Sequence, residues 1–186
     1  VLGLPETAAV LAQVAKVKPV SAMVEGTSAS AAYWLASQAS DITLTPSGEV
    51  GSVGVRMMHV DMSKMLEDSG FKVTELYSGN FKTEWSPFKP LSDEAKEDMQ
   101  TRLSAVHNDF VNAVVSGRGR RASTQMQRTR MGEGRMFSAS EAMGHGLADK
   151  IQSPREFYKA VTSVSQENQT GFGAYRARLD LERQRF

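Results

Sequence analysis

The chain has 186 residues, a length that suits one domain with a short appendage. Its apolar residues make up 40% of the total, which is enough for a buried core and excludes wholesale disorder. Its 22 basic and 21 acidic residues nearly balance, so charge alone favours neither nucleic acid nor a membrane surface as a partner. The absence of cysteine excludes disulfides, thiol catalysis and cysteine-bound zinc.

The first part of the chain predicts a helix, a strand and a second helix. Apolar residues at helical spacing indicate a helix over residues 5–16. A short buried strand is predicted at 20–24. After a glycine turn, Thr27 or Ser28 is expected to cap a helix over residues 29–39.

Strand and helix patterns continue to alternate in the middle of the chain. Strands are predicted at 42–45, 50–55 and 72–77, and two glycines in the second of these indicate a close backbone approach. A short helix is predicted at 62–68, and a loop at 78–91. This alternation is typical of βαβ units and predicts an α/β fold.

The clearest helix is predicted over residues 93–115, where apolar residues recur every three or four positions. Asp98 and Arg102 are spaced to form an ion pair on its outer side. Two capping boxes predict the starts of two further helices: Ser138 with Glu141, and Ser153 with Glu156.

Ser30 stands where a strand is expected to give way to a helix, followed by two small residues. The unpaired N–H groups of a helix start can stabilise an oxyanion, so a serine here could be a nucleophile. A serine in a first helical turn is also a common structural residue, and the segment alone leaves both readings open.

A nucleophilic serine needs a base, and the sequence offers histidines or a lysine. The three histidines, His59, His107 and His145, have no recognisable acidic partner nearby and are expected to be structural or solvated. Lys82 lies among aromatic residues, and desolvation would lower its pKa towards the value that a base requires. Most lysines are simply exposed, so this signal is weak by itself.

Three segments in register resemble the S49 peptidase family, which includes bacterial signal peptide peptidase A and the head-maturation proteases of tailed phages. They are Ser30-Ala31-Ala32-Tyr33-Trp34, Gly51-Ser52-Val53-Gly54-Val55 and Ser78-Gly79-Asn80-Phe81-Lys82. Two further segments, Gly117-Arg118-Gly119 and Gly146-Leu147-Ala148-Asp149, are also similar to the family pattern.

The resemblance implies a role for four residues. Ser30 would be the nucleophile, Lys82 its general base, and Ser52 the residue that orients the lysine. The Ala31 N–H would bind the oxyanion, at a position where the family usually has glycine. No metal and no cofactor are expected.

The resemblance also implies a crotonase/ClpP-like βαβ superhelix without its N-terminal strands. Residues 1–163 would form an S49-type protease domain that is N-terminally truncated and lacks a glycine-rich oxyanion loop. Residues 164–186 are expected to be a polar linker or tail.

The expected function is that of a phage prohead protease that cleaves scaffold and capsid proteins in the host cytoplasm. The alternative is a bacterial signal peptide peptidase that degrades remnant signal peptides at the envelope, through an anchor outside this chain. The resemblance further implies a homo-oligomer with sites shared between protomers. A non-catalytic assembly module, a crotonase-like acyl-CoA enzyme and a Ser–His–Asp hydrolase remain open.

Two other features have structural interpretations. Six arginines between residues 118 and 135 lack interleaved aromatic residues, so a solvated or intersubunit surface is expected rather than nucleic-acid binding. Met57 and Met58 are expected to fill the core.

Overall fold

The computed structural model describes residues 2–122 and 131–163, in which short strands form two three-stranded sheets. The first sheet has the order β1-β3-β6, and its pairs are parallel. The second has the order β2-β4-β5, with β4 and β5 antiparallel. The strands are β1 Ser21–Val24, β2 Thr27–Ala29, β3 Asp41–Leu44, β4 Glu49–Gly51, β5 Met136–Ser138 and β6 Lys150–Ile151. Parallel strands connected through helices confirm the predicted α/β class.

Two neighbouring strands of the first sheet continue side by side into the second. Val24 O accepts a hydrogen bond from Thr45 N (3.0 Å), and Gly26 O accepts one from Glu49 N (2.8 Å). The chain therefore passes from β1 into β2 and from β3 into β4 while the two segments stay hydrogen-bonded to each other. The prediction that the first strand is buried is wrong for most of its length, because β1 is an edge strand of which only Val24 is buried.

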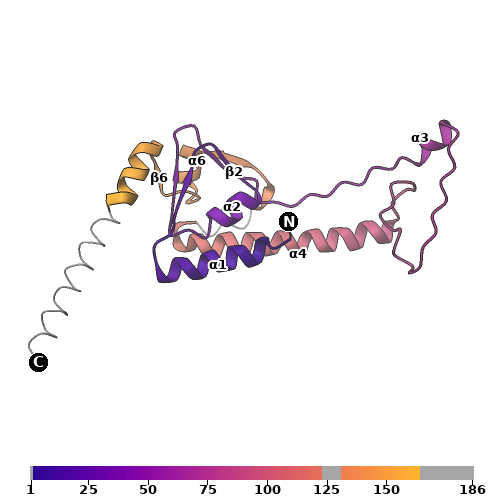
Figure 1. Ribbon diagram of the computed structural model, residues 1–186, viewed down its shortest axis with the longest axis horizontal. Helices are drawn as coiled ribbons and strands as arrows, with labels where there is room; N and C mark the ends of the chain where they lie inside the picture. The colour runs from indigo at the N-terminus through magenta and orange to yellow at the C-terminus, as the bar shows by residue number, and fades with distance from the viewer. Residues whose placement is uncertain (1, 123–130, 164–186) are drawn as a thin grey trace, which may run out of the picture.

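Three helices cover the strands and build the core around the site. Helix α1 (Leu4–Val17) lies along α4 (Asp93–Arg118), and α2 (Ala31–Ala36) packs against both of them (Figure 1). The centre of this packing is Trp34 of α2 stacked on Phe110 of α4, with ring centroids 4.6 Å apart and planes 8° from parallel. The first and the long helix are thus confirmed, each with a slightly longer extent than predicted.

The predicted helix starts after residue 92 are also confirmed. The Ser138–Glu141 capping box begins α6 (Ala139–Gly144), and Ser153 with Glu156 begins a helix at residue 154. Short 3-10 turns, η1 (Gly119–Arg121) and η2 (Met131–Glu133), lie between α4 and β5. None of the helices in the described ranges has the length and apolar character needed to cross a membrane.

An arm, defined here as residues 57–91, leaves the strands after β4 and carries α3 (Ser63–Asp68) at its far end (Figure 1). The strand predicted at 72–77 is wrong, because no strand among the described residues pairs with this segment. The two limbs of the arm contact each other instead, where Met62 N donates to Pro87 O (2.7 Å).

Apolar side chains of the arm are exposed in the single chain. Met57 is 55% exposed and Met58 84% exposed, so the prediction that they fill the core is wrong. Other large apolar side chains that the arm leaves in solvent include Met65, Phe71, Leu76, Tyr77 and Phe81. Exposed apolar side chains on an extended segment suit a surface that another molecule covers.

Candidate active site

Ser30 joins β2 to α2 in a conformation unusual for a serine. Its φ is 52° and its ψ is −120°, and residues in such regions cost about 1–3 kcal/mol and cluster at functional sites. The backbone is held there because the Ser30 N–H donates to Gly51 O (2.9 Å) and the Trp34 N–H donates to Ser30 O (2.9 Å). The Ser30 side chain makes no capping bond to α2, so its hydroxyl is not committed to the helix.

The helix start differs from the sequence prediction. Thr27 and Ser28 belong to β2 and do not cap α2, which begins at Ala31 and ends at Ala36. The pairing of β2 with β4 keeps these residues extended until the chain reaches Ser30. This correction places Ser30 at the end of a strand, where its backbone turns sharply.

Ser52 lies beside Ser30 because the strands before the two serines pair in register. Ala29 is opposite Gly51 in the parallel pair of β2 and β4, so the next residue of each strand emerges at the same edge. Ser52 also has a positive φ, 53°, and its N–H donates to Arg135 O (2.7 Å). In the part of the chain that the structure describes, Ser30 and Ser52 are the two non-glycine residues with positive φ.

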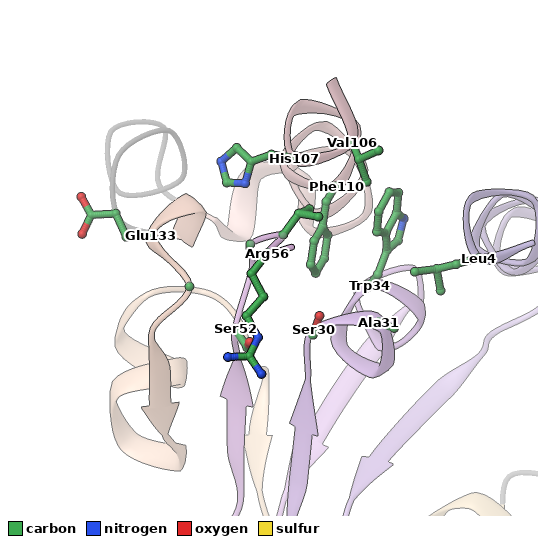
Figure 2. Close-up of a pocket in the computed structure, with 13 residues that line it drawn as sticks. Leu4, Ser30, Ala31, Trp34, Ser52, Arg56, Val106, His107, Phe110 and Glu133 are labelled. Atoms are coloured by element: carbon green, nitrogen blue, oxygen red, sulfur yellow. The ribbon is translucent and has the colours of Figure 1, made fainter. Parts of the chain in front are cut away.

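The two serines line one cleft of about 750 Å³ (Figure 2). One side of the cleft is apolar and is formed by Leu4, Trp34, Val106 and Phe110, while Ser52 and Arg56 lie on the other side. The remaining lining residues are Ala31, Gly54, Val55, His107, Glu133 and Gly134. A cleft with one apolar wall and a few polar groups has the composition of a typical ligand site.

Ala31 is the first residue of α2, and it also lines the cleft. N–H groups in a first helical turn have no intrahelical acceptor, so they are available to a ligand. The backbone of Ala31 is thus suited to the oxyanion role that the resemblance implies. That role remains a prediction.

Lys82 is not brought to Ser30 within one chain. It lies on the arm and is exposed, and it is not among the residues that line the cleft. Its backbone N–H donates to Gly79 O (3.1 Å) in a turn. The described part of the same chain therefore does not supply the desolvated surroundings that a lysine base needs.

The histidines fall in three different environments. His59 bonds to Ser86 O (3.0 Å), which agrees with a structural role. His145 is the C-cap residue of α6 and packs edge-on against Phe137. His107 lines the cleft together with Ser30, a placement that its sequence context did not signal. In the described ranges no group of three or more His, Asp or Glu side chains could hold a metal ion.

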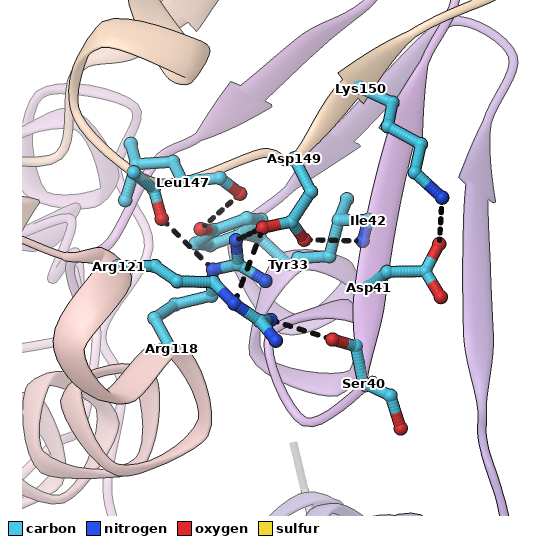
Figure 3. Close-up of polar contacts among 10 residues, drawn as sticks. Tyr33, Ser40, Asp41, Ile42, Arg118, Arg121, Leu147, Asp149 and Lys150 are labelled. Atoms are coloured by element: carbon cyan, nitrogen blue, oxygen red, sulfur yellow. Dashed lines mark hydrogen bonds and ion pairs between the residues drawn. The ribbon is translucent and has the colours of Figure 1, made fainter.

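A buried ion pair joins Arg118, the last residue of α4, to Asp149, which lies between α6 and β6 (Figure 3). The Arg118 side chain has no exposed surface, and its guanidinium donates to Asp149 (2.7 Å) and to Gly146 O (3.0 Å). The prediction of a solvated or intersubunit surface is therefore wrong for Arg118. Of the other arginines in that group, Arg120, Arg121 and Arg135 are exposed, and Arg128 and Arg130 lie outside the described residues.

This ion pair is connected to α2 and to β3. The Tyr33 hydroxyl donates to Leu147 O (2.9 Å), and burial raises the pKa of Tyr33. Asp149 accepts the Ile42 N–H (2.8 Å). Burial tends to raise the pKa of Asp149, but the hydrogen bonds from Arg118 and Ile42 outweigh it and hold this pKa below its usual value.

Comparison with known proteins gives sequence relatives that include phage and bacterial proteins named as proteases. The chain is 32% identical over 151 residues to "Capsid assembly protease C" of Escherichia phage lambda, covering 81% of this chain and 34% of that protein. It is 30% identical over 154 residues to "Head-tail preconnector protein GP5" of Enterobacteria phage P21, covering 83% and 30%. A "Putative signal peptide peptidase SppA" of Enterococcus faecium is 28% identical, covering 80% and 44%. The chain thus spans about a third to a half of these relatives.

Solved structures are similar in fold only. An enoyl-CoA hydratase from Thermoplasma volcanium GSS1 aligns with a TM-score of 0.49 at 15% identity, covering 88% of this chain and 46% of that one. A mutant of a membrane-bound stomatin-specific protease aligns with a TM-score of 0.45 at 13% identity, covering 82% and 60%. Similarities at this level say nothing about the reaction.

The family assignment comes from the sequence match. The family model "Peptidase family S49" matches residues 12–169, which is most of the chain. This range includes Ser30, Ser52 and Lys82, and also the Arg118–Asp149 pair. The resemblance inferred from the sequence motifs is confirmed, and the chain belongs to peptidase family S49.

Proposed function

We propose that this chain is the catalytic part of a serine endopeptidase in which Ser30 is the nucleophile and Lys82 of a neighbouring copy is the base. The observation that carries the proposal is the conformation of Ser30. This serine lies at a helix start and lines the cleft, and its side chain makes no capping hydrogen bond to α2. Membership of a peptidase family supports the same reading.

In the proposed reaction, a neutral Lys82 amine takes the proton of the Ser30 hydroxyl as its oxygen attacks the peptide carbonyl. The Ala31 N–H stabilises the oxyanion that forms. The lysine then returns the proton to the leaving amine, the C–N bond breaks, and an acyl-enzyme remains. Water, deprotonated by the same amine, hydrolyses the ester and frees Ser30. Ser52, which lines the cleft beside Ser30, would orient the incoming lysine.

The exposed arm is the reason for assigning the lysine to a neighbour. Lys82 must lose water to become a base, and the described residues of its own chain do not bury it. The same arm exposes Leu76 (95%), Phe71 (67%) and Phe81 (64%), which a second copy could cover. Docking of the arm would bury these side chains and Lys82 together, so assembly and activation would coincide.

The proposed substrates are scaffold and capsid proteins in a phage prohead, within the host cytoplasm. The relatives named as a capsid assembly protease and as a head-tail preconnector protein support this choice. The alternative is degradation of remnant signal peptides at the bacterial envelope, which the 28% identity to a putative signal peptide peptidase supports. Comparing the rate at which the protein cleaves a phage scaffold protein with the rate at which it cleaves a signal peptide would distinguish the two substrate classes.

The test of the catalytic proposal is active-site labelling with a fluorophosphonate, followed by peptide mass mapping. We expect the label on Ser30, no label in Ser30→Ala, and greatly reduced labelling in Lys82→Ala, with unchanged circular dichroism in both variants. Label on another residue, or cleavage that survives Ser30→Ala, would refute the assignment. A folded protein that neither reacts nor cleaves would instead be a non-catalytic assembly module.

A further inference from the structure

Arg56 places a positive charge in the cleft that holds Ser30. It follows β4 by a few residues and lines the cleft together with Ser30 and Ser52. In Figure 2 its side chain extends towards the end of the cleft where the two serines lie. Glu133 also lines the cleft, but its carboxylate points away from the serines in the same view.

The Arg56 guanidinium has no protein partner in the described part of the chain. The ion pairs and hydrogen bonds of these residues involve other arginines, such as Arg102, Arg118 and Arg121. A guanidinium has five N–H donors in a planar fork that matches the two oxygens of a carboxylate. These donors are therefore available to a bound molecule.

The surroundings of Arg56 strengthen an interaction with an anion. The opposite wall of the cleft is apolar, with Trp34 and Phe110 stacked beside Leu4. A peptide lying in the cleft would exclude water between this wall and Arg56, and a charge-assisted hydrogen bond is stronger where water is excluded. A neutral substrate would instead displace water from the guanidinium without replacing its hydrogen bonds.

We infer that Arg56 is a specificity-determining residue that binds a carboxylate of the peptide substrate close to the scissile bond. This inference rests on the proposed peptidase function. The carboxylate could belong to an Asp or Glu side chain, or to the free C-terminus of a short peptide, and both present the same pair of oxygens. Arg56 takes no proton and forms no bond to the reacting carbonyl, so it acts on substrate choice.

The experiment compares matched peptides on the full chain. The first peptide series is end-blocked and has Glu or Gln scanned through the positions that flank the cleaved bond. The other uses peptides with either a free C-terminal carboxylate or a C-terminal amide. The readout is the ratio of kcat/KM for the charged and neutral member of each pair, in wild type, Arg56→Gln, Arg56→Glu and the control Arg120→Gln. Arg120 is exposed and lies outside the cleft.

We expect wild type and Arg120→Gln to prefer the charged peptide in one of the two peptide series, and that series identifies the source of the carboxylate. Arg56→Gln should lower this preference by about 10- to 100-fold, the effect of one hydrogen bond between charged groups. Arg56→Glu should reverse it. An unchanged ratio in Arg56→Gln, or an equal loss for charged and neutral peptides, would overturn the inference.

Fluorophosphonate labelling separates this outcome from failure of the proposed function. If Ser30 is labelled in wild type and in Arg56→Gln while the charge preference is the same in both, the inference fails and the peptidase proposal stands. If wild type is neither labelled nor able to cleave any peptide, both fail. Labelling in both proteins with loss of charge preference only in Arg56→Gln supports both.

Discussion

The buried ion pair between Arg118 and Asp149 should respond unequally to removal of its two members. Asp149→Ala leaves a guanidinium with no exposed surface and without its carboxylate, so unfolding should become easier by about 3–5 kcal/mol. Arg118→Met leaves Asp149, which is 17% exposed and keeps the Ile42 N–H (2.8 Å) and Arg121 Nε (3.5 Å). The cost there should be smaller, about 1–3 kcal/mol.

The double variant Arg118→Met/Asp149→Ala makes the prediction sharper. Because neither charge is then left alone in the interior, its loss of stability should be at least about 2 kcal/mol less than the sum of the two single losses. Urea unfolding followed by circular dichroism measures all four proteins, provided that the m-values agree. Equal losses in the two single variants, or an additive double variant, would refute the reasoning.

Three further predictions concern pH, a glycine and the cleft. The folded pKa of Asp149 lies below its unfolded value, so its contribution to stability should be present above the unfolded pKa and lost as the pH falls through the folded pKa. Urea midpoints across this pH range should therefore fall less in Asp149→Ala than in wild type. An identical fall of the midpoint in both proteins would contradict the linkage. Gly51→Ala should destabilise by about 2–4 kcal/mol, because φ is +134° and a Cβ would collide with Arg135 O. Gly70→Ala, with φ +78° and open space around the Cβ, should cost only about 1 kcal/mol. Equal urea midpoints for the two variants would exclude the close approach of Arg135 O to Gly51. Arg56→Glu should reverse the charge preference of cleavage, measured as the kcat/KM ratio for Glu and Gln peptides, and a preserved preference would count against an anion site in the cleft.

Elements with a local physical cause could be predicted from the sequence. The long helix has apolar spacing along its whole length, and a Ser92 hydroxyl accepts the Ala95 N–H at its start (3.1 Å). In the Ser138–Glu141 capping box, the two residues that bond to each other are likewise only three positions apart in the sequence. The proximity of Ser30 and Ser52 came from the family resemblance, and the register of β2 with β4 supplies the physical reason.

Features that depend on distant partners could not be predicted. Residues 72–77 alternate like a strand, yet a strand forms only where another strand pairs with it, and none does among the described residues. Arg118 is charged and lies in a basic stretch, so nothing local indicated burial; its partner Asp149 is 31 positions away. Arg56 and His107 reach the cleft through the fold alone.

The pairing of Ser30 with a neighbour's Lys82 is tested most directly by mixing two inactive variants. Ser30→Ala and Lys82→Ala are dissociated together and allowed to reassemble, and cleavage of a peptide substrate is then measured. Because an assembly of both variants contains some pairs of an intact serine with an intact lysine from another copy, the mixture should regain activity that neither variant has alone. No recovery in the mixture, under conditions in which dissociated wild type regains its activity, would contradict a shared catalytic site.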